Sequence, residues 1–158
     1  PGAFYVNVHT TDFVGGAIRG QLSAGPPPAG EAHLLPTPLR AYDSRDNGGA
    51  KIGPVDTRTI SLATGKNELG ASVIAVPPGA TAAIVTLTVT ETVGVGGFLK
   101  MYSAALAAAP ATSSINWAGA NQNLAVSTQV AVDGALQVKV TGGANPTHFV
   151  IDVIGYLY

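Results

Sequence analysis

Residues 148–158, with the sequence HFVIDVIGYLY, decide the fold of this chain. A nearly continuous apolar run of this length is typical of a strand covered on both faces, so we predict a central strand rather than an edge strand. One carboxylate, that of Asp152, lies in the middle of the run. A charge buried alone is strongly unfavourable, so we expect Asp152 to be paired, solvated at a rim or used in chemistry.

The composition around this strand favours an all-β protein. A chain of 158 residues is long enough for one domain with a real hydrophobic core. Apolar residues make up 46% of the chain and charged residues only 11%, with 20 glycines and 11 prolines. This mixture predicts many short strands joined by turns, and it disfavours both a helical protein and a disordered one.

Charge and cysteine content exclude several classes of function. The net charge of −1 and the absence of Lys or Arg runs argue against nucleic-acid binding. Without cysteine there is no disulfide, thiolate nucleophile or cysteine zinc site, and the three histidines (His9, His33 and His148) lack metal-ligand spacing, so we expect no metal or cofactor. No apolar stretch approaches a membrane span, so we expect no membrane insertion. Pro1 starts neither a signal peptide nor a chain with initiator Met, which predicts a processed product or a fragment.

Residues 1–23 predict a β-hairpin. Apolar and polar residues alternate on each side of a glycine-containing turn region. An isolated two-stranded hairpin is marginal in water, so we expect this one to dock on another element or subunit. The apolar residues predicted to dock are Phe4, Val6, Val8, Ile18 and Leu22.

Residues 24–37 are rich in proline and glycine and predict an extended, semi-rigid linker. Residues 38–158 then predict an antiparallel β-sandwich, jelly-roll-like, of about eight strands, to which the hairpin is an appendage. The strands are expected near residues 39–42, 57–62, 82–91, 98–103, 113–117, 124–132, 135–140 and 147–158.

Two motifs near the N-terminus are familiar. Residues 5–10 read YVNVHT and residues 15–22 read GGAIRGQL. Together they resemble the closing hairpin of chordin-type (CHRD) domains, whose motif runs YVNVHT…GGEIRGQL, with Ala17 at the usually acidic position. The resemblance covers only the first part of the chain, and the remainder of a CHRD sandwich lies outside it.

The larger part of the chain resembles a second family on five motifs in order: LRAYDSR at 39–45, VPPGATA at 76–82, GFL at 97–99, SSINW at 113–117 and VIDVIGY at 150–156. Residues 39–158 are in this way similar to the accessory β-sandwich modules of secreted bacterial proteins, which also occur beside extracellular hydrolases. The resemblance implies an extracellular or cell-surface β-sandwich without an established catalytic role.

Charged residues cluster in the segment that opens the sandwich, between Arg40 and Arg58. We predict a structural ion-pair group of Asp43, Arg45 and Asp152, with Arg45 as the partner of Asp152 because a guanidinium can hold a carboxylate with two hydrogen bonds. A solvated loop and a ligand or cation site are the alternatives.

The cation alternative rests on Asp43, Asp46, Asn47 and Asp56, whose side chains offer oxygen ligands for calcium. Their spacing lacks the rhythm and the terminal glutamate of an EF-hand, so the signal for calcium is weak.

Trp117 is the candidate glycan contact. An aromatic face stacks on sugar C–H groups while neighbouring amides bond hydroxyls, and the amide residues near Trp117 are Asn116, Asn121, Gln122 and Asn123. The competing interpretation places Trp117 in the core or at its rim.

Two functional hypotheses follow, and no nucleophile–base or paired-carboxylate arrangement supports an enzyme. The leading hypothesis is a secreted, non-catalytic structural or adhesive module that forms a homo-oligomer or homopolymer. Its hairpin would add a strand to a neighbour or exchange with it, and head-to-tail repetition would build a fibre. Docking of the hairpin on its own sandwich stays open. The other hypothesis is a carbohydrate-binding accessory module with an extracellular polysaccharide as partner.

Overall fold

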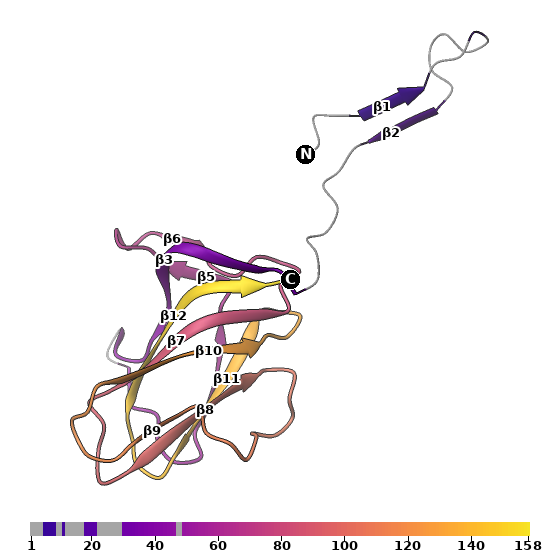
Figure 1. The fold of residues 1–158 in the computed structure, drawn as a ribbon. Helices are drawn as coiled ribbons and strands as arrows, with labels where there is room; N and C mark the ends of the chain where they lie inside the picture. The colour runs from indigo at the N-terminus through magenta and orange to yellow at the C-terminus, as the bar shows by residue number, and fades with distance from the viewer. Residues whose placement is uncertain (1–4, 9–10, 12–17, 22–29, 47–48) are drawn as a thin grey trace.

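The computed structural model describes residues 5–8, 11, 18–21, 30–46 and 49–158, and this part of the chain contains twelve strands and no α-helix (Figure 1). None of the described residues forms a helix that is long and apolar enough to cross a membrane. The strands are β1 (Tyr5–Val8), β2 (Ile18–Gln21), β3 (Ala32–Asp43), β4 (Thr57–Ser61), β5 (Thr64–Lys66), β6 (Ser72–Ile74), β7 (Ala82–Thr90), β8 (Gly97–Ser103), β9 (Ile115–Trp117), β10 (Leu124–Ala131), β11 (Gln137–Gly143) and β12 (His148–Leu157).

Strands β3 to β12 form an antiparallel β-sandwich with jelly-roll connectivity. One sheet has the order β10-β7-β12-β3-β5-β6 and the other the order β4-β11-β8-β9. Four antiparallel pairs, β3 with β12, β4 with β11, β7 with β10 and β8 with β9, divide between the two sheets. This is the arrangement of a long double strand wound into two Greek keys. The predicted fold is confirmed, and the short β5–β6 hairpin is an addition to it.

All eight predicted strands are present, but the sandwich starts earlier than the sequence indicated. Residues 32–37, predicted as linker, form the first half of β3, where Leu34 pairs with Gly155 of β12. The ladder is interrupted between this pair and the next one, Val153 with Leu39. Pro36 and Pro38 lie in the interruption, and because proline cannot donate a ladder hydrogen bond, they are accommodated there without breaking the strand.

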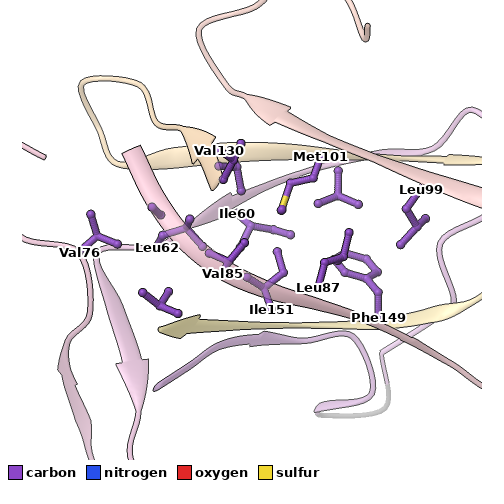
Figure 2. Close-up of a cluster of buried hydrophobic side chains, with 14 of the residues drawn as sticks. Ile60, Leu62, Val76, Val85, Leu87, Leu99, Met101, Val130, Phe149 and Ile151 are labelled. Atoms are coloured by element: carbon purple, nitrogen blue, oxygen red, sulfur yellow. The ribbon is translucent and has the colours of Figure 1, made fainter. Parts of the chain in front are cut away.

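Strand β12 lies between β7 and β3, which confirms the predicted central strand (Figure 1). Its side chains Phe149, Ile151 and Val153 point between the sheets and are fully buried. They meet Leu87 of β7 and Leu99 of β8 in the core shown in Figure 2. Burying side chains of this size contributes about 1.5–3 kcal/mol each, which makes β12 a principal source of stability.

Two glycines let aromatic rings lie flat against the four-stranded sheet. Gly97 is the register partner of Trp117, and Gly143 is the register partner of Phe98. A Cβ atom added at Gly97 would lie 2.1 Å from Cζ2 of Trp117, and one added at Gly143 would lie 2.1 Å from Cζ of Phe98. Each ring therefore covers the place where a side chain would otherwise stand.

Candidate functional site

The outer face of the six-stranded sheet carries a polar row that crosses every strand. Directly opposed residues of neighbouring strands project to the same face, so the register partners line up. Side chains alternate between the two faces of a strand, and Val85 and Leu87, the neighbours of Thr86 in β7, point into the core. The polar row therefore lies on the outer face. From β10 to β6 its members are Ser127, Thr86, Asp152, Arg40, Lys66 and Ser72.

Asp152 pairs with Arg40 at the centre of this row. Nε of Arg40 donates to Oδ1 of Asp152 at 2.9 Å, and Nη2 donates to Oδ2 at 3.2 Å. Asp152 is 20% exposed and Arg40 is 45% exposed, so the pair lies at the water-accessible surface of the sheet. The predicted partner, Arg45, is wrong. The expectation that a guanidinium would hold Asp152 with two hydrogen bonds applies to Arg40.

Arg45 lies beyond the end of β3 and binds Asp43. Its backbone N–H donates to Oδ1 of Asp43 at 3.0 Å, and its Nη2 donates to Oδ2 at 2.6 Å. Because Arg45 belongs to the turn after the strand, its side chain folds back on the residue two positions earlier instead of reaching the middle of β12. Nη1 of Arg40 lies 3.5 Å from Oδ2 of Asp43, so Arg40 joins Asp43, Arg45 and Asp152 in one network.

The pKa values of Asp43 and Arg40 move in the direction that favours the charged form. The hydrogen bond from Arg45 lowers the pKa of Asp43 below its usual value, although burial of this carboxylate, only 6% exposed, acts in the opposite direction. The hydrogen bond with Asp152 raises the pKa of Arg40. The charged forms of Asp43 and Arg40 are therefore favoured, and the hydrogen bonds from Arg40 to Asp152 hold β3 to β12.

A surface cavity of about 470 Å³ lies beside the network. Nζ of Lys66 and Oδ2 of Asp46 form a further ion pair there, with a distance of 3.1 Å. These two residues line the cavity together with Arg40, Asp152 and Glu68. Arg40 is paired with Asp152 and Lys66 with Asp46, and these ion pairs tie β12 to β3 and β5 to the turn after β3.

The oxygen atoms suggested for calcium do not meet at one point. Asp43 is held by Arg45, Asp46 by Lys66, and Oδ2 of Asp56 accepts from the backbone N–H of Gly53. Asn47 lies outside the described residues. Within the described part of the chain, no three His, Cys, Asp or Glu side chains form a group that could hold a metal ion.

Trp117 does not offer a ring face to a sugar, which corrects the predicted glycan site. It is 4% exposed and belongs to the core cluster. Its ring covers Gly97 of the adjacent strand, so the face that could stack on a pyranose is occupied by the protein.

The amides around Trp117 serve local structure. Oδ1 of Asn116 accepts from Ser113, and Oδ1 of Asn123 accepts from Thr90. Asn121 adopts a positive φ of 56°, a conformation that asparagine tolerates better than most residues. The predicted set of Trp117, Asn116, Asn121 and Asn123 therefore does not form a common binding surface.

Sequence reasoning missed a buried polar contact between β3 and β12. The hydroxyl of Ser44 accepts a hydrogen bond from the backbone N–H of Phe149 and lies 2.9 Å from Nδ1 of His148. Since the hydroxyl already accepts from Phe149, it can donate to a neutral His148. Burial lowers the pKa of His148, which favours this neutral form. A serine that immediately follows a predicted strand was the available sequence signal.

The hairpin forms a two-stranded sheet of its own within the described residues. Val8 pairs with Ile18 and Val6 with Gly20, whereas Asn7 pairs with Arg19. The docking role predicted for Val6, Val8 and Ile18 stays a prediction. Phe4 and Leu22, the remaining members of the predicted docking set, lie outside the described residues.

Comparison with known protein families bears on this hairpin. Residues 1–22 match the CHRD domain family. The match ends before β3 and supports the resemblance stated for the hairpin motifs; it says nothing of the sandwich. Among curated proteins, none matches the chain.

Proposed function

We propose that this chain is a non-catalytic structural or adhesive module of an extracellular protein, which assembles with copies of itself through its N-terminal hairpin. The jelly-roll sandwich is the scaffold, and the hairpin is the element that docks on a neighbouring subunit. Repetition of this contact from one subunit to the next would build a fibre.

The observation that carries the proposal is the pairing of β1 and β2 with each other alone among the described strands. A two-stranded ribbon is marginal in water and becomes stable when a further strand or an apolar surface covers it. Val8 is the register partner of Ile18 and Asn7 that of Arg19, and the alternation of apolar and polar residues in the sequence predicts one apolar and one polar face. Such a ribbon is suited to strand addition, where backbone bonds give adhesion and alternate side chains give register.

The sandwich supports this role as a rigid carrier. Its core is continuous between the two sheets, and its outer charges are engaged with one another across β3, β5 and β12. The proposed extracellular location follows from the resemblance of residues 39–158 to accessory modules of secreted bacterial proteins.

Amide hydrogen exchange on the full chain tests the proposal. Backbone amides of β1 and β2 are expected to exchange more slowly as protein concentration rises, because docking on a second chain protects them. Val8→Asp should remove this protection, since it puts a charge on the docking face. Asn7→Asp is the matched control on the opposite face and should retain it.

The exchange pattern also separates the alternatives. Protection that does not change with concentration would mean that the hairpin docks on its own sandwich. Hairpin amides that exchange at unprotected rates at every concentration, or equal protection in Val8→Asp and wild type, would contradict the proposal.

A further inference from the structure

We propose that β10 is a self-association edge, which pairs in antiparallel fashion with β10 of a second copy across a two-fold axis and joins two six-stranded sheets into one. This contact is separate from the hairpin contact and does not depend on it.

β10 is the longest of the strands that end the two sheets. The sheets end in four edge strands, β10, β6, β4 and β9. β10 has eight residues, whereas β4 has five and β6 and β9 have three each. β4 also carries a charge, that of Arg58. A short or charged edge discourages pairing with another chain, and β10 has neither protection.

The free side of β10 retains its backbone hydrogen-bonding groups. Its ladder partner is β7, on one side only (Figure 1). Among the described residues, its backbone forms one further bond, in which the hydroxyl of Thr128 donates to the carbonyl of Gln129 at 3.4 Å. In an antiparallel ladder alternate residues direct their N–H and C=O groups away from the existing partner, so these groups are available to a new strand.

The composition of β10 favours a second copy as the occupant. Its sequence, LAVSTQVA, has no charged residue and no proline. In a two-fold pair, residues near the axis face themselves or close neighbours, so any charge there would meet a like charge. Ser127 and Thr128 lie at the middle of the strand instead, and hydroxyl groups can both donate and accept.

The alternation of faces limits the register. Ser127 lies on the outer face with Ala125 and Gln129, whereas Val126 and Val130 lie on the core side. Residues that oppose each other across the dimer must lie on the same face of the joined sheet. One residue of β10 must therefore oppose its own copy, with the two-fold axis between them. Ser127 and Thr128 are the two positions that keep nearly the whole strand paired.

The hairpin of a neighbouring chain is the competing occupant. β1 and β2 have four residues each, half the length of β10. A second β10 matches the edge in length by symmetry, so it satisfies more of the free backbone groups. We therefore assign the edge to a second copy.

Sedimentation velocity of the full chain over a concentration series tests this assignment. Val8→Asp removes the hairpin contact, so the full chain carrying it is expected to show a reversible monomer–dimer equilibrium, and the β10 variants are compared in this background. The double variant Ser127→Lys/Gln129→Lys opposes like charges in both registers, and its dimer dissociation constant should rise by about tenfold or more. Circular dichroism melts would establish that each variant remains folded.

Charge-complementary variants then identify the axis. Ala125→Lys/Gln129→Glu should dimerise more tightly than the Val8→Asp parent chain if the axis passes through Ser127, because positions 125 and 129 then face each other. Ser127→Lys/Gln129→Glu should dimerise more tightly if the axis passes through Thr128, because positions 127 and 129 then face each other. A parent chain that is monomeric at all concentrations, a double-lysine variant that dimerises like the parent chain, or failure of both charge-complementary variants to dimerise more tightly would each overturn the proposal.

Discussion

Gly97→Ala should destabilise the sandwich strongly for so small a change. The added Cβ would lie 2.1 Å from Cζ2, 2.3 Å from Cε2 and 2.8 Å from Cη2 of Trp117. All three atoms belong to the six-membered part of the indole, which is buried and cannot swing into solvent. Overpacking of this kind costs about 1–3 kcal/mol. For a domain of this size the melting temperature should fall by roughly 2–12 °C.

Urea and thermal unfolding followed by circular dichroism would measure this effect. Gly134→Ala is the matched control, because a Cβ at Gly134 meets no atom within 4 Å. Trp117→Phe removes most of the clashing atoms, so Gly97→Ala should cost less in that background, with a coupling energy of about 0.5–3 kcal/mol. The Trp117 ring does not occupy the place of a side chain at Gly97 if Gly97→Ala has the melting temperature of wild type. The same conclusion follows if the free-energy changes of Gly97→Ala and Trp117→Phe are additive in the double variant.

Three further predictions concern the polar contacts between β3 and β12. Arg40→Met should lower the free energy of unfolding by about 1 kcal/mol in urea, because it leaves Asp152 unpaired while partial exposure limits the cost. The free energy of unfolding should also fall as the pH drops below 3.8, the usual pKa of the Asp43 carboxyl. The pKa of Asp43 is lower in the folded state, so the unfolded chain takes up the proton first. In an acid titration of stability, Asp43→Asn should weaken this pH dependence. The pKa of His148 is likewise lowered from 6.5 in the folded state, so the free energy of unfolding should begin to fall as the pH drops through 6.5. His148→Gln should remove this part of the pH dependence.

Each of these has a result that would count against it. Equal stability of Arg40→Met and wild type would mean that the pair contributes nothing. An acid limb unchanged in Asp43→Asn would assign that dependence to other carboxylates. If His148→Gln still loses stability as the pH falls from about 7 through 6.5, another group titrates in that range.

The strands that sequence reasoning found are those with a clear apolar pattern. β7 alternates Val85 and Leu87 with Thr86 and Thr88, and β12 is nearly continuous in apolar residues. β5 and β6 were missed because three-residue strands carry too few positions for a period to be visible. The start of β3 was missed because its prolines are typical of a linker, and only the interrupted ladder explains how a strand accommodates them.

The candidate site shows where one-dimensional reasoning stops. A guanidinium partner for Asp152 was predictable from the cost of an unpaired charge, but choosing between Arg40 and Arg45 requires the register of β3 on β12. The error at Trp117 has the same origin, because Gly97 lies beneath its ring only after β8 and β9 pair. The uncharged sequence of β10 was visible from the start, yet only the sheet order shows that this strand is an edge.

The pairing of β3 with β12 determines how the sandwich responds to tension. The chain enters the fold at Ala32 and leaves it at Leu157, and these two residues are register partners at the same end of the sheet. The backbone N–H of Tyr158 also donates to the carbonyl of Glu31 just outside this pair. A pull applied at residues 31 and 158 would load the outermost hydrogen bonds first and peel the strands apart one pair after another, rather than shear the whole ladder at once. The sandwich should therefore open at low force when it is pulled from these two positions.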